Sequence, residues 1–220
     1  MNNQTNSMSR IRTLTQLAIL SAIIAVLAFT PLGSIPLGGP IVATIVQFPV
    51  VVGAILMGPK AGGLLGGVFG LCSMLWFTIY GTPTAFVFSP FYSSQIADGA
   101  MQTVIYAVGA IVTCFVPRIL IGVISAYVYR AVSKKDKHQY FACGLAGVVG
   151  AMVNTILVMG CILLFFMQPY ANANGVLPTA LWGIIGTTIA VNGVLEAIVT
   201  GILVVAIAKP LLVITKKRRV

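Results

Sequence analysis

The sequence predicts an all-α integral membrane protein with six transmembrane helices and with both termini on the cytoplasmic side. Its 220 residues are 59% hydrophobic and 7% charged, with a mean hydropathy of +1.05, whereas a soluble domain carries about 25% charged residues. Twelve of the thirteen Lys and Arg residues lie at the chain ends or in two short connections. This positive-inside distribution indicates a lipid bilayer as partner, and no nucleic acid.

The positions of the charges divide the chain into three parts. Residues 1–13 form a cytoplasmic N-terminal segment, 14–209 a six-helix membrane domain, and 210–220 a basic cytoplasmic tail. The first helix is expected at 14–29. Such a beginning resembles a signal peptide, but five further spans favour a retained helix. Ala18 and Ala22 form a small-xxx-small pair that lets another helix approach closely.

The next two helices are expected at 41–57 and 61–79, after an uncharged Pro/Gly turn at 30–40. Pro49 should kink the second helix. The third carries glycines at positions 62, 66 and 70, on one face. These predict close packing of helices, more simply within the monomer than against a partner.

Residues 80–100 form the longest irregular stretch, with two prolines, five aromatic residues and a single charge. Such a long loop is usually functional or disordered, and its aromatic content argues against disorder. It is either an ordered lid over a pocket, which we favour, or an interfacial aromatic belt. Its candidate binding residues are Thr84, Phe88, Ser89 and Tyr92.

Charge parity sets the number of crossings after the loop. Lys60 marks the inside before the third helix, and the basic residues from Arg130 to Lys137 mark it again. Only one returning helix fits, expected at 109–130 with Pro117 inside it, which leaves 101–108 as an outer or re-entrant segment. The fifth helix is expected at 141–167, an uncharged outer loop at 168–183, and the sixth helix at 187–209.

Four polar residues on three predicted helices share one depth in the bilayer. At 1.5 Å per residue, Arg118, Glu196 and Asn154 all lie about 18–21 Å from the cytoplasmic edge, and Asn192 lies one turn beyond Glu196. Intramembrane ionisable groups usually face protein or water and mark functional sites. The layer, roofed by the three uncharged outer connections, predicts a pocket for a small water-soluble molecule. The alternative is that Arg118 and Glu196 satisfy only each other.

Several chemistries are not indicated by the sequence. There is no GxxxxGK[ST] phosphate-binding motif, so the chain does not itself drive an ATP-powered pump. There is no HExxH motif, and the single histidine, His138, lies in a basic loop. The four cysteines have no CxxC spacing and are expected to be reduced packing residues. We expect no enzymatic activity, no cofactor and no bound metal.

The sequence resembles the substrate-binding S components of energy-coupling factor (ECF) vitamin transporters, most closely the pantothenate-specific type. The segments that carry the resemblance are AILSA at 18–22, FTPLGSIPLG at 29–38, QFPVVVGAILMGPKAGGLLGGVFGL at 47–71, TPTAFVFSPF at 82–91, CFVPRILIGV at 114–123 and GTTIAVNGVLEAI at 186–198. The resemblance implies an S-component-like six-helix bundle in the cell membrane. It also implies a pocket built from helices four to six and the loops after helices one and three. It further implies that Ala18 and Ala22 contact a transmembrane coupling subunit.

The leading hypothesis is therefore a vitamin-capture subunit, most simply for pantothenate, that works with a separate transmembrane coupling subunit and two ATPases. Two alternatives remain open at this point. The first is an S component for another water-soluble vitamin, and the second is a stand-alone ion-coupled carrier that uses Glu196.

Overall fold

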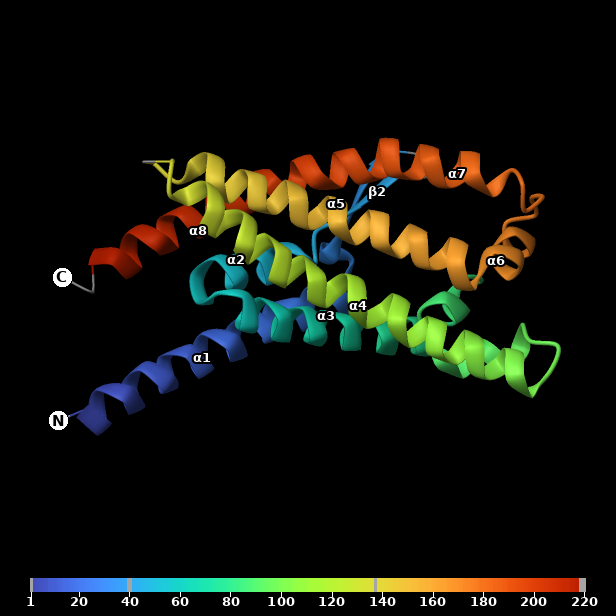
Figure 1. The fold of residues 1–220 in the computed structure, drawn as a ribbon, viewed down its shortest axis with the longest axis horizontal. Helices are drawn as coiled ribbons and strands as arrows, with labels where there is room; N and C mark the ends of the chain where they lie inside the picture. The colour runs from blue at the N-terminus through green and yellow to red at the C-terminus, as the bar shows by residue number, and fades with distance from the viewer. Residues whose placement is uncertain (1, 39–40, 137, 218–220) are drawn as a thin grey trace.

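The computed structural model describes residues 2–38, 41–136 and 138–217. Its long helices run side by side along one axis of an elongated molecule (Figure 1). In chain order the elements are α1 (Asn2–Phe29), a 3₁₀ turn (Pro31–Gly33), β1 (Ser34–Gly38), β2 (Ile41–Thr44), α2 (Phe48–Met57), α3 (Pro59–Tyr80), 3₁₀ turns at Ala85–Val87 and Pro90–Gln95, α4 (Ala100–Ser133), α5 (Tyr140–Phe165), α6 (Met167–Ala173), α7 (Leu181–Thr188), a π-helical turn (Ile189–Gly193) and α8 (Val194–Lys217).

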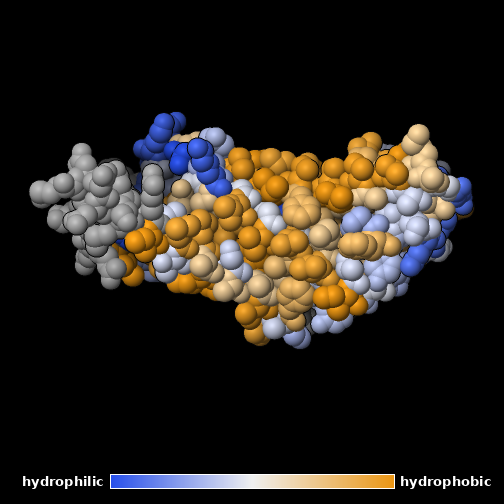
Figure 2. Space-filling model, turned by 90° about the horizontal axis from the view of Figure 1, so that it is seen from below, coloured by the Kyte–Doolittle hydropathy of each residue, from blue (hydrophilic) through white to orange (hydrophobic). Residues whose placement is uncertain are grey.

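The helices form an integral membrane bundle, as predicted. Among the described residues, five helices are long and apolar enough to cross a bilayer. Figure 2 shows a broad hydrophobic surface across the middle of the molecule with hydrophilic residues toward its ends. The second predicted span, α2, has only 10 residues, about 15 Å of helix against a hydrocarbon core of about 30 Å. Six complete crossings therefore stay a prediction.

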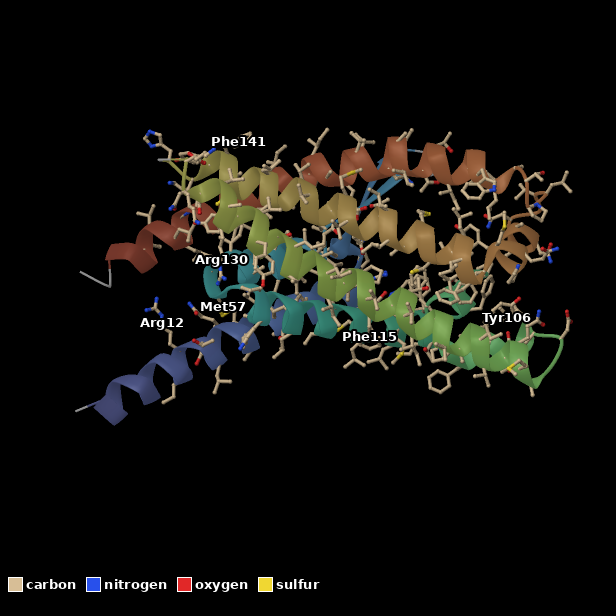
Figure 3. The ribbon with its side chains drawn as sticks, viewed as in Figure 1. Arg12, Met57, Tyr106, Phe115, Arg130 and Phe141 are labelled. Atoms are coloured by element: carbon tan, nitrogen blue, oxygen red, sulfur yellow. The ribbon has the colours of Figure 1, made fainter. Side chains whose placement is uncertain are left out.

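The two termini lie at the same end of the molecule (Figure 1). Arg12 and Arg130 lie toward that end with Phe141, whereas Tyr106 lies at the opposite end (Figure 3). Gly62 of α3 lies against Gly122 of α4, and Gly70 lies against Cys114, so the two helices are antiparallel. This is the arrangement that charge parity predicts. That this end faces the cytoplasm stays a prediction.

The region of the first turn and the second helix differs from expectation. Residues 41–44 form a strand that pairs antiparallel with β1, so the fold is helical except for this hairpin; residues 39–40 of the expected turn lie outside the described residues. Pro49 occupies the first turn of α2 and does not kink it. Proline is tolerated there because the N–H groups of a first helical turn have no helical partner.

Three other helices also differ in length from the prediction. Residues 101–108 are not a separate segment, because α4 is continuous from Ala100 to Ser133. The last span begins at Leu181 and continues through α8 to Lys217, so part of the expected tail is helical. Likewise α1 already begins at Asn2. Except at Leu181, charge set the boundary of the prediction, but charge limits what enters the bilayer and does not end a helix.

The carboxylate of Asp136 lies just before the start of α5, at the basic end of the bundle. It accepts hydrogen bonds from the backbone N–H of Ala142 (3.0 Å) and of His138 (3.1 Å). These bonds, chiefly the one from Ala142, lower the pKa of Asp136. Asp136 thus satisfies the N–H group of Ala142, which the first turn of α5 leaves without a helical partner.

The glycine face of α3 packs backbone to backbone on α4. A Cβ atom at Gly62 would lie 2.6 Å from the carbonyl oxygen of Gly122, and one at Gly66 would lie 2.1 Å from that of Arg118. At Gly70 the nearest atom would be the carbonyl oxygen of Cys114, at 2.9 Å. These distances are below van der Waals contact, so only glycine permits this approach. The preferred interpretation of the glycines, packing within the monomer, agrees with the structure.

Gly66 and its neighbour Gly67 provide a matched test of this contact. In Gly66→Ala the new methyl group must push α4 away, and overpacking of this kind typically costs about 1–3 kcal/mol. A Cβ at Gly67 would meet nothing within 4 Å. Thermal unfolding in detergent should show a clear loss of stability for Gly66→Ala and none for Gly67→Ala. Equal melting temperatures of the two variants would contradict the close approach.

The membrane orientation is tested by cysteine labelling in a background without the four natural cysteines. Asn172, in the short helix α6, and Lys135, between α4 and α5, are both exposed and lie at opposite ends of the bundle (Figure 1). In intact cells an impermeant maleimide should label Asn172→Cys and leave Lys135→Cys unlabelled. After permeabilisation both cysteines should react with the maleimide, which would show that they differ in access from outside and not in reactivity. Labelling of Lys135→Cys in intact cells would overturn the predicted orientation.

Candidate substrate-binding cavity

A cavity of about 680 Å³ lies between the helices at the level of the predicted polar layer. It is lined from the end of α1, the end of β2, one face of α3, Phe88, α4, α5 and the α7–α8 junction. Arg118, Asn154, Asn192 and Glu196 all line it. The structure therefore brings together the four residues that the depth argument placed in one layer. Its volume is in the range of small-molecule sites.

Arg118 is a buried cation that forms no ion pair with any carboxylate of the described residues. Its side chain is 6% exposed, and its Nη1 donates a hydrogen bond to the carbonyl oxygen of Thr113 at 2.7 Å. Its Nε is buried without a hydrogen-bond partner. The rings of Phe69 and Phe88 lie 5.6 and 5.1 Å from the guanidinium carbon. Arg118 makes no ion pair with Glu196, so the alternative of a self-satisfied pair does not describe this structure.

Glu196 lies elsewhere in the cavity wall, in contact with a hydroxyl group. It is 9% exposed and accepts a hydrogen bond from the hydroxyl of Thr155 at 3.4 Å. Thr44, at the end of β2, lines the same cavity. The Oδ1 of Asn154, on α5, is buried with no partner. Two buried polar atoms of cavity-lining residues, the donor Nε of Arg118 and the acceptor Oδ1 of Asn154, therefore have no hydrogen-bond partner among the described residues.

A π-helical turn at Ile189–Gly193 aligns the last set of polar residues. Thr188, Asn192 and Glu196, spaced by four, all line the cavity. In an α-helix, residues spaced by four drift about 40° around the axis at each step. A π turn holds more residues per turn and offsets that drift. Such turns are frequent at functional sites, and no sequence signal predicted this one.

The loop at 80–100 contributes one of its four candidate residues to the cavity. Phe88 lines it and stacks on Phe77, with ring centroids 4.4 Å apart. Ser89 is buried and hydrogen-bonds the hydroxyl of Thr78 at 2.7 Å, and the hydroxyl of Tyr92 donates to the backbone carbonyl of Thr78 at 3.0 Å. These two bonds fasten the loop to α3. Neither Ser89, Tyr92 nor Thr84 lines the cavity.

The sequence argument missed the contribution of α3. Its cavity face consists of Phe69, Ser73, Trp76, Phe77 and Tyr80. Their spacing of three and four residues is that of one helix face, and an aromatic stripe with one hydroxyl was a usable signal. Conversely, none of residues 168–183 lines the cavity, so the predicted roof of three outer connections is reduced to two.

Ala18 and Ala22, the residues predicted to contact a coupling subunit, do not line this cavity. Both are exposed on α1, a helix of which only 6% of the apolar span is buried in the protein. The small-xxx-small pair therefore has no partner helix within the described protein. The face that contains it also exposes large apolar residues, among them Ile19 and Ile23.

Comparison with known proteins agrees with this architecture. A family profile described as "ECF transporter, substrate-specific component" matches residues 12–208. The chain is 34% identical over 172 residues to the pantothenic acid transporter PanT of Lactococcus lactis subsp. cremoris, covering 78% of this chain and 79% of that protein. It is 29% identical over 190 residues to the pantothenate transporter PanT of Leuconostoc mesenteroides subsp. mesenteroides, covering 86% and 82%.

These relatives are transporters and not enzymes, and with five apolar spans the chain is a multi-pass protein of the cell membrane. Because the profile covers nearly the whole chain, the protein belongs to the family of substrate-specific components of ECF transporters.

Proposed function

We propose that this chain captures pantothenate for an ATP-driven importer, together with a separate transmembrane coupling subunit and two ATPase subunits. Two relatives that cover most of the chain carry the name of pantothenate transporters. The cavity supports the same substrate on independent, chemical grounds.

The observation that carries the proposal is the unpaired guanidinium of Arg118. A buried charge without a counter-ion is costly, and this one has a single hydrogen bond and two aromatic rings around it. Five N–H donors in a planar fork suit a carboxylate, which can accept two of them at once. The carboxylate of a bound ligand would form the direct ion pair that Arg118 does not form with Glu196.

The remaining polar groups suit the other end of pantothenate. The molecule has a carboxylate at one end, an amide in the middle and two hydroxyl groups at the other end. In our proposal the hydroxyl and amide donors face Asn154, Asn192 and Glu196, which line the cavity. The gem-dimethyl group then packs on the aromatic face of α3. A site with donors at one end and acceptors at the other favours a ligand with the complementary arrangement, an acceptor at the first end and donors at the second.

Arg118→Met tests the anion site, because methionine keeps an apolar stem of similar length without the charge. Loss of a buried charged hydrogen bond typically costs about 2–5 kcal/mol, so pantothenate affinity should fall about 30-fold or more. Arg118→Lys should recover only part of it, since an ammonium group cannot reproduce the fork. Isothermal titration calorimetry on the purified protein measures both.

The matched control is Arg130→Met, which removes an exposed arginine on the same helix but outside the cavity. It should leave the affinity unchanged. A monodisperse gel-filtration peak for all three variants shows that they remain folded. If folded Arg118→Met binds pantothenate as tightly as the wild type, Arg118 does not hold the carboxylate.

Ala18 and Ala22 are proposed to contact the coupling subunit. Ala22→Leu adds bulk to an exposed position, so it should leave pantothenate binding and melting temperature unchanged. It should nevertheless lower uptake in proteoliposomes that contain the whole importer, because small residues permit close helix approach. Parallel loss of binding and uptake would mean that the alanine acts within the monomer. Uptake by the wild-type chain without ATPases would instead support a stand-alone carrier that uses Glu196.

A further inference from the structure

The residue before Arg118 removes a backbone hydrogen bond from the helix that carries it. Pro117 lies inside the continuous helix α4, where a proline has no N–H to donate. In an α-helix the N–H at position 117 would bond to the carbonyl oxygen four residues earlier. That carbonyl belongs to Thr113.

The same carbonyl is the one that Arg118 uses. Its Nη1 donates to the oxygen of Thr113 at 2.7 Å, and this is the only hydrogen bond of the guanidinium among the described residues. Helical side chains slant toward the N-terminus of their helix, so Arg118 reaches back over the turn that the proline has opened. The rings of Phe69 and Phe88 flank the guanidinium and provide no acceptor for its N–H groups.

We propose that Pro117 is a positioning residue for Arg118. By withholding its N–H it leaves the Thr113 carbonyl available, and this carbonyl fixes the guanidinium against the cavity wall in the orientation that receives a ligand carboxylate. The inference rests on the proposed function for the identity of that ligand. With alanine at 117 the backbone bond re-forms and turns the carbonyl back along the helix axis. The guanidinium then loses its anchor although Arg118 itself is unchanged.

A positioning role and a purely structural role of Pro117 can be told apart by the direction in which its replacement changes stability and ligand affinity. A proline inside a helix destabilises it relative to alanine, because it removes a backbone hydrogen bond and crowds the preceding turn. Pro117→Ala should therefore keep or raise the melting temperature while it weakens ligand binding. A residue that only supports the fold would change stability and affinity in the same direction.

The experiment uses the full chain in detergent and compares Pro117→Ala with Pro210→Ala. Pro210 also lies inside a helix, α8, but it is followed by Leu211 and lies outside the cavity. Calorimetry is done with pantothenate and with pantothenol, in which an alcohol replaces the carboxylate. We expect Pro117→Ala to bind pantothenate about 10-fold more weakly, and pantothenol with little change. Pro210→Ala should bind both ligands as the wild type does.

Three results would overturn the inference. They are native pantothenate affinity in folded Pro117→Ala, an equal loss for both ligands, and a loss of affinity that accompanies a lower melting temperature. If the wild type binds no pantothenate, the proposed function fails, and an experimental structure of Pro117→Ala decides the inference alone. A guanidinium still bonded to the Thr113 carbonyl there would refute it, and a displaced guanidinium would support it.

Discussion

The site depends on the close approach of α3 to α4. Because Gly62, Gly66 and Gly70 carry no side chain, the backbone of α3 lies directly on the carbonyls of α4, including that of Arg118. This contact presents the aromatic face of α3 to the arginine, with Phe69 one helical turn from Gly66. A wider separation would admit lipid or water and would remove the rings that flank the cation. The glycines thus act on the site without lining it.

The consequence is a charge that the protein holds but does not neutralise. Arg118 is fixed by one backbone carbonyl and two rings, while Glu196 accepts a hydrogen bond from the hydroxyl of Thr155 on α5. An ion pair between them would fill the cavity with a contact that a ligand must break. Because no such pair forms and both residues line the cavity, a ligand with a carboxylate at one end and hydroxyl groups at the other can contact both. Phe88 also links this arrangement to the outer loop, since it flanks Arg118 and stacks on Phe77.

Sequence reasoning predicted the membrane class and the polar layer because both follow from one-dimensional rules. Hydropathy and basic residues mark the spans, and counting 1.5 Å per residue placed Arg118, Asn154, Asn192 and Glu196 at one depth. Helix ends were less predictable, since α4 and α8 continue past the charges that were read as limits. The hairpin and the π turn depend on tertiary packing and backbone hydrogen bonds that leave no clear pattern. Ser89 and Tyr92 were chosen because they are polar loop residues, but they bond to Thr78.

An experimental structure of the wild-type chain with pantothenate bound would show whether the guanidinium of Arg118 holds the ligand carboxylate, as we propose. We expect a carboxylate oxygen within about 3 Å of the Arg118 guanidinium nitrogens, with the hydroxyl groups of the ligand toward Asn154 and Glu196. A carboxylate bound elsewhere, with the guanidinium of Arg118 still without a counter-ion, would contradict this proposal.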